Sequence, residues 1–284
     1  MACLHAAFRL LAMSLFILAM LTSMVLSEGV LPNPNDIHGG VTMGVSNVLC
    51  DDGKTNIAMD YDPRSSDEYT CTENIHNNYK VGLQYNHCDE IAQRPLHICY
   101  PRNISYTEDL PTSGSHRPIW PKYGTYKYVP PQRWIHSLEH GAVVFLYHPC
   151  ADPSQIEQFK GVARSCMYRH IIAPYKKLPP EMNFALLAWR CKLVLSSVDV
   201  PSMVNFVKTH ALQAPEHTSR DGLYEAGLLR HAQILSDQND SELCPKMSIM
   251  SVTAEDFKTK SAARRSKSRL AQEELMQILS QLLA

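Results

Sequence analysis

The sequence predicts an α+β protein with a small mixed sheet, helices packed on one face of the sheet, and an N-terminal lobe held together by disulfide bonds. Residues 131–211 alternate apolar runs of strand length with segments of helical periodicity, an order typical of layered α+β domains. Residues 50–99 contain four cysteines and no long apolar run, which favours a lobe stabilised by two bridges rather than by a large core.

Residues that commonly begin or end helices support the helices expected within residues 131–211. Pro131 suits the first turn of a helix that Gly141 can end. Asp152 and Pro153 are the residue types favoured at the N-cap and first position of the next helix. The sequence predicts, in chain order, a helix at 131–140, a strand at 142–147, a helix from 153 to about 168, strands at 170–173 and 184–195, and a helix near 201–211.

Outside this region the periodicity is weaker. A strand at 41–49, short strands around 79–85 and a helix at 223–235 are the remaining elements that the residue types favour. The chain then divides into a leader at 1–27, a cysteine-rich lobe at 28–104, an α+β domain at 105–211 and a polar region at 212–284. That last region ends in a basic run and an amphipathic helix, which could contact a membrane surface or dock on its own domain.

The N-terminus predicts a secretory leader. Arg9 precedes a long apolar run, and small residues suit cleavage after Ser27. The alternative is that the run stays in place as an N-terminal membrane anchor. Secretion agrees with the glycosylation sequons that begin at Asn103 and Asn239. We therefore expect a protein of the secretory-pathway lumen or the cell exterior.

Cysteine usage supports the same compartment. Without the leader and its Cys3, the chain keeps an even number of cysteines, which in a secreted protein predicts disulfide bonds without fixing their pairing. The candidates are Cys50, Cys71, Cys88, Cys99, Cys150, Cys166, Cys191 and Cys244. No C-x-x-C motif is present to suggest thiol exchange. The formal net charge of -1 argues against a nucleic-acid partner.

The pattern H-x-x-E-H occurs at His136, Glu139 and His140, and one class of zinc peptidases uses this pattern. Residues four apart on a helix share a face, so both imidazoles can reach one metal ion while Glu139 acts as a base. His116, in a loop rich in Pro, Gly and Ser, is the best candidate for a third ligand. His148 is a weaker candidate, because it lies at the far end of the following strand. The sequence does not establish a cofactor, and zinc or copper is the metal that such a set of ligands could bind.

Three interpretations of these histidines stay open. Arg117, Arg133 or backbone carbonyls could hold them as neutral structural residues, which is their most ordinary role. They could also bind a structural metal or perform acid–base chemistry. The leading hypothesis is a protein-interaction module with a protein partner, and the competing one is a metal-dependent hydrolase with Glu139 as general base. The sequence leans away from an enzyme, because it offers no complete catalytic set.

Parts of the sequence resemble a known family. The resemblance covers about residues 105–210, and its residues are Pro111–His116, Trp134–Val144, Phe145–Cys150, Cys166 and Leu187–Trp189. The first two stretches resemble the domain of unknown function numbered 3105, for which no reaction is assigned. The others are similar to an animal p53-inducible protein that is regarded as growth-suppressing and membrane-anchored. The resemblance implies a related domain and growth suppression, although the sequence shows no later membrane-spanning segment.

Overall fold

The computed structural model describes residues 36–76 and 80–245. The chain divides into two units, Met1–Gly40 and Val41–Ala284. The described residues of the first unit form a turn. The second unit contains the sheet, its helices and the candidate site. The predicted leader and the predicted basic run and C-terminal helix lie outside the described residues, and they stay predictions.

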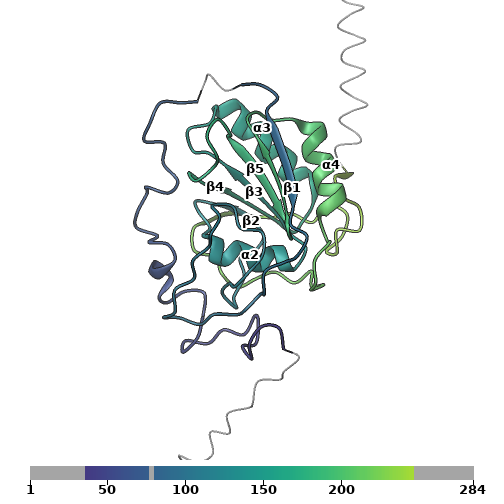
Figure 1. The fold of residues 1–284 in the computed structure, drawn as a ribbon. Coiled ribbons are helices and arrows are strands. Elements are labelled where there is room, and N and C mark those ends of the chain that lie inside the picture. Colours follow the sequence, from purple (N-terminus) through teal and green to yellow (C-terminus); the bar gives the residue numbers. More distant parts are fainter. Residues whose placement is uncertain (1–35, 77–79, 246–284) are drawn as a thin grey trace, which may run out of the picture. The chain divides into compact units, whose positions relative to one another are not determined.

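Seven strands in the described part of the chain form one mixed sheet in the order β1-β6-β5-β3-β4-β2-β7 (Figure 1). The strands are β1 (Gln84–Cys88), β2 (Gly124–Tyr126), β3 (Val143–Tyr147), β4 (His170–Pro174), β5 (Phe184–Ala188), β6 (Cys191–Leu195) and β7 (Leu228–His231). β4 pairs in parallel with β2 and β3, whereas the other neighbouring strands pair antiparallel. Together with the three α-helices of residues 36–245, residues 77–79 aside, this sheet confirms the predicted α+β class.

The helices begin where the sequence predicts. They are α2 (Pro131–Glu139), α3 (Pro153–Cys166) and α4 (Val200–His210). The Asp152 side chain accepts hydrogen bonds from the backbone N–H groups of Ser154 and Gln155, so it caps α3. After α2 the chain turns through Gly141, whose φ of +80° lies in the left-handed region that glycine adopts without strain.

The two faces of the sheet have separate hydrophobic cores. On β3, Val144 and Leu146 join the core that contains Trp134 of α2. Val143 and Phe145 alternate with them and join the core formed with α3 and α4. Two helices thus cover one face, as predicted, and α2 with its flanking loops covers the other (Figure 1).

Four disulfides pair all eight predicted cysteines. The pairs are Cys50–Cys99, Cys71–Cys150, Cys88–Cys191 and Cys166–Cys244. Only the first closes within the N-terminal lobe, where two bridges were expected. The reason is that two segments of the lobe pair with later parts of the chain. β1, which begins within the stretch predicted as short strands, joins the sheet beside β6 and brings Cys88 to Cys191. The segment after Cys71 pairs through His76 with the backbone at Cys150 and Ala151. The bridges indicate an oxidising extracellular or secretory compartment. Among the described residues, no helix is long and apolar enough to cross a membrane.

Three weaker predictions of secondary structure are wrong. Residues 41–49 form turns and a single bridge instead of a strand. The predicted strand at 184–195 is two strands, β5 and β6, because the chain reverses at Arg190 with a φ of +64°. Residues 223–235 do not form a helix, since Gly227 has a φ of +78° and the residues after it pair with β2 as β7.

Substitution of Gly141 tests the tight passage from α2 into β3. We expect Gly141→Ala to lower the free energy of unfolding by about 1 to 3 kcal/mol, because of strain at positive φ. A Cβ atom there would also lie 2.8 Å from Cα of Leu212. Denaturant unfolding measures the effect, with Gly161→Ala as control, because a Cβ at that α3 position meets nothing within 4 Å. Equal stability of the two variants would contradict this account.

Candidate metal centre

Three histidines and one glutamate meet at the end of α2. His97, His116, His136 and Glu139 each place one ligand atom within 4.8 Å of the others. All four residues are between 0 and 2% exposed. Helix α2 carries His136 and Glu139 in its last turn, three residues apart and therefore on the same face. The other two histidines come from loop segments.

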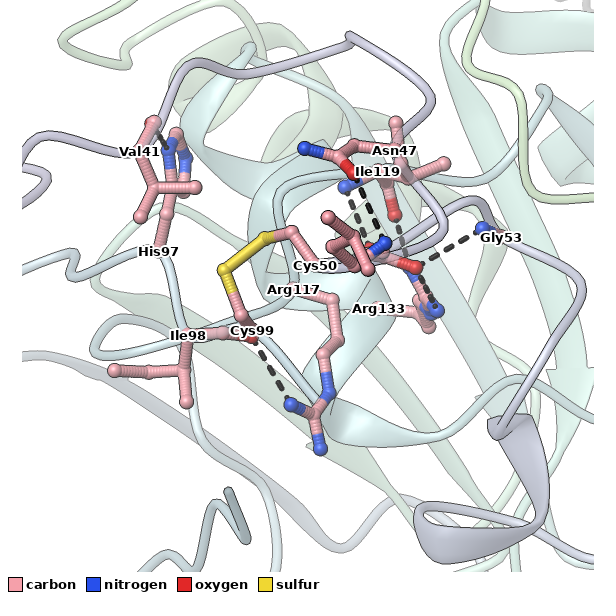
Figure 2. The surroundings of a disulfide bond; sticks show 12 residues. Val41, Asn47, Cys50, Gly53, His97, Ile98, Cys99, Arg117, Ile119 and Arg133 are labelled. Carbon is pink, nitrogen blue, oxygen red and sulfur yellow. Dashed lines mark hydrogen bonds and ion pairs between the residues drawn. A yellow bond between two sulfur atoms is a disulfide. The ribbon is translucent and has the colours of Figure 1, made fainter. Parts of the chain in front are cut away.

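The two loop histidines are brought together by backbone pairing. His97 and His116 form an isolated parallel bridge. The N–H of His116 donates to the carbonyl of Leu96, and the N–H of Ile98 donates to the carbonyl of His116, both at 2.9 Å. The disulfide of Cys99 anchors the first of these segments (Figure 2). Sequence-distant loops are thereby fixed against each other at the ligand positions.

A backbone carbonyl fixes the tautomer of each of the three histidines. The Nδ1 atoms of His97, His116 and His136 lie at 2.7, 2.8 and 2.6 Å from the carbonyl oxygens of Val41, Gly114 and Arg117, respectively. Because a carbonyl oxygen can only accept, each Nδ1 carries the proton and donates it. In the neutral ring the lone pair then belongs to Nε2. Metal-bound histidines are oriented by this same kind of hydrogen bond.

The electrostatics of the cluster favour a bound cation. Burial holds the pKa of His136 well below its usual value, and His116 and His140 lower it further, so this ring is neutral. Nε2 of His116 lies 3.1 Å from a carboxylate oxygen of Glu139. Among the described residues, no hydrogen bond reaches Nε2 of His116 or His136. Lone pairs and a carboxylate therefore face one another in a buried space, an arrangement that a metal ion would stabilise.

His140 belongs to a neighbouring group that shares His136. His136, His140 and Glu216 place their ligand atoms within 4.8 Å of one another. Nδ1 of His140 lies 3.2 Å from a carboxylate oxygen of Glu216, and the ring packs against Trp120 at 4.5 Å. Burial lowers the pKa of His140 to about 3, although the Glu139 carboxylate opposes this shift. His140 is thus a neutral imidazole.

The structure brings most of the predicted residues together and adds two. His116, His136 and Glu139 lie in the first group, and His140 lies beside it, so the H-x-x-E-H segment contributes to both groups. His97 and Glu216 were not predicted. No spacing signals them, because each reaches the cluster through the fold of an irregular segment.

His148, the weaker candidate, lies in a different group. Its ring stacks on His76 at 4.5 Å, and its Nε2 is 3.6 Å from a carboxylate oxygen of Glu73. Nδ1 of His148 accepts a hydrogen bond from the backbone N–H of Cys150. The sulfur of Cys150 is bonded to Cys71 and is therefore no thiolate ligand. His148, His76 and Glu73 therefore form a separate group near the disulfide that follows β3.

The two arginines that were considered as partners of the histidines have partners of their own. Arg117 forms a two-point ion pair with Asp60, and Arg133 forms one with Asp51. Backbone carbonyls do hold the rings of His97, His116 and His136 at Nδ1, as the structural interpretation expects. Neither arginine is placed to occupy the opposite nitrogen of His116 or His136, which no hydrogen bond reaches in the described part of the chain.

Both sequons lie at the surface. The side chains of Asn103 and Asn239 are exposed. A glycosyltransferase needs such exposure. Their glycosylation stays a prediction.

The fold and the site define a class: a cystine-linked α+β domain with a buried histidine cluster. Residues 97–222 match the model of a family described as "Protein of unknown function (DUF3105)". This part of the chain is therefore similar to that family, and it includes all the ligand candidates from His97 to Glu216. No curated protein and no solved structure matches the chain.

Proposed function

We propose that this protein is a secreted or luminal metal-binding protein, in which one zinc ion at His97, His116, His136 and Glu139 stabilises a domain that acts by binding a protein partner. The convergence of three imidazole rings, each oriented at Nδ1 by a backbone carbonyl, and one carboxylate carries the proposal. Imidazole nitrogens and a carboxylate oxygen are common zinc ligands, and copper is the alternative metal.

Burial of the ligands supports a structural role for the metal rather than a catalytic one. Catalytic zinc sites keep one position open for water or substrate, whereas structural sites are closed by protein ligands. His97 is 2% exposed and the other three ligand candidates are 0% exposed. The position of Glu139 adds to this argument, because a carboxylate 3.1 Å from Nε2 of His116 is placed as a ligand. The hydrolase hypothesis would need this residue as a free base.

Metal content tests the proposal. We expect about one zinc or copper ion per chain, by elemental analysis of the untagged protein from a secretory host. His136→Ala should lose it, because that ring supplies a central ligand. The control is His170→Ala, which removes another buried histidine whose Nδ1 donates to a backbone carbonyl, that of Met167. Wild-type protein without stoichiometric metal would overturn the proposal.

Glu139→Gln separates the two roles of this carboxylate. If Glu139 is a ligand, the variant should bind metal at least about tenfold more weakly. If it is a general base in a hydrolase, the variant should keep its metal and lose only turnover. The substitution preserves side-chain size, so we expect the variant to fold like the wild type. Dialysis of both proteins against the same metal buffer then compares their metal affinities directly.

The biological role proposed here follows from the resemblance to animal p53-inducible proteins, tumour protein p53-inducible protein 13 in particular. A growth-suppressing role outside the cell requires a protein partner. The C-terminal region is one place for such contact, or for contact with a membrane surface, and it lies outside the described residues. Affinity purification from the secretory pathway, followed by binding with purified components, tests this role independently of the metal.

A further inference from the structure

We propose that His140 and Glu216 form an outer metal position, through which the ion reaches the inner site at His97, His116, His136 and Glu139. This inference rests on the proposed function and deepens it, because it assigns a route for metal uptake and release. The outer position shares His136 with the inner site, and its three ligand atoms lie within 4.8 Å of one another.

The burial of His140 and the lack of hydrogen bonds to its ring from the described residues suit a metal ligand better than a packing residue. Its side chain is 0% exposed, and in the described part of the chain no hydrogen bond reaches either of its ring nitrogens. A buried polar atom left without a hydrogen bond destabilises the fold, and among the described residues Nε2 of His140 is such an atom. The nearest carboxylate oxygen, on Glu216, lies 3.2 Å from Nδ1.

Glu216 connects this buried ring to the surface. Its side chain is 20% exposed, whereas His140 and the inner ligands are almost fully buried. It lies in the irregular segment 212–220, which is joined to the site by two backbone hydrogen bonds. These run from the N–H of Leu212 to the carbonyl of Gly141 and from the N–H of Glu216 to the carbonyl of Glu139. An ion arriving from solvent meets the Glu216 carboxylate first.

His136 decides how the two positions are related. Its Nδ1 donates to the carbonyl of Arg117, so only Nε2 is available for a metal. One nitrogen cannot ligate two ions at once, and the two positions are therefore alternatives for a single ion. An ion that keeps His136 while exchanging His140 and Glu216 for the inner ligands always retains one imidazole. Each position also supplies one carboxylate against the charge of a divalent ion.

The kinetics of metal exchange test this route. Metal-free full-length protein is mixed with Co²⁺, whose visible absorption reports its coordination, and uptake and chelator-driven release are timed. Glu216→Gln and His140→Ala should slow both processes at least about tenfold, while the final content stays at about one ion per chain. His217→Ala is the control, because that neighbouring side chain is exposed and belongs to neither group. It should exchange metal at the wild-type rate.

The other outcomes separate this inference from the proposed function. Wild-type rates in both variants would overturn the outer position and leave the inner site standing. Loss of bound Co²⁺ at equilibrium in His140→Ala, with the circular dichroism spectrum unchanged, would make His140 an inner ligand and also overturn the route. Absence of any Co²⁺ uptake by the wild type would overturn the proposed function itself.

Discussion

Removal of the bound metal is expected to lower the free energy of unfolding by about 4 kcal/mol, the stabilisation that a ligand gives when its concentration is a thousand times its dissociation constant. The physical reason is the cluster of acceptors. Without a cation, Nε2 of His116 and of His136 face the Glu139 carboxylate in a buried space. For a domain of roughly 200 residues, this loss corresponds to a melting temperature lower by about 10 °C.

Thermal unfolding under non-reducing conditions measures this effect, before and after prolonged dialysis against a zinc chelator. Readdition of zinc should restore the melting temperature. His136→Ala should melt at a low temperature that the chelator no longer changes, and His170→Ala should remain sensitive to the chelator. If the wild type loses its metal and melts unchanged, the metal has no structural role and the closed-site argument fails.

Local sequence signals predicted the part of the site that depends on local structure. Pro131 and Gly141 delimit α2, and the spacing within it places His136 and Glu139 on one face whatever the rest of the chain does. The same reasoning placed β3 and α3, whose apolar runs and cap residues are contiguous in sequence. Helix periodicity therefore predicted two of the four ligand candidates of the inner site, His136 and Glu139.

The remaining half depends on pairing between distant segments, which periodicity does not encode. His97 reaches the site because its segment pairs with that of His116. Glu216 reaches it through an irregular segment held by two backbone hydrogen bonds. The disulfide from Cys88 to Cys191 spans 103 residues, and it follows from the place of β1 in the sheet rather than from cysteine spacing.

The turn at Arg190 shows a different limit. Residues 184–195 are mostly apolar because β5 and β6 are both largely buried, and a mainly apolar run of this kind predicts one long strand. The chain reverses there without glycine, asparagine or proline at the turn, so the usual turn residues give no signal. Here, burial of the sheet on both faces removed the alternation that would have revealed two strands.

The ion pair between Asp51 and Arg133 is expected to be the strongest single anchor of α2, and Asp51→Asn should cost about 3 to 5 kcal/mol of stability. Both Nη atoms of Arg133 donate to the Asp51 carboxylate, at 2.6 and 2.9 Å. Asp51 is 2% exposed and Arg133 is 0% exposed. Burial opposes the charge of Arg133, yet the hydrogen bonds and attraction of Asp51 hold its pKa above the usual value. The substitution would leave that charge buried and unpaired.

Guanidinium chloride unfolding of Asp51→Asn measures this cost, and Glu225→Gln is the matched control. Glu225 pairs with Lys122 at 2.6 Å, but its side chain is 48% exposed, so its loss should cost less than about 1 kcal/mol. Adding Arg133→Met to Asp51→Asn should recover part of the stability, because the uncompensated charge is then removed as well. Because Arg133 lies on α2, one turn before His136, Asp51→Asn should also weaken metal binding. If Asp51→Asn keeps the stability and the metal affinity of the wild type, the prediction is wrong. In that case the packing of α2 on the sheet is enough to position the ligands.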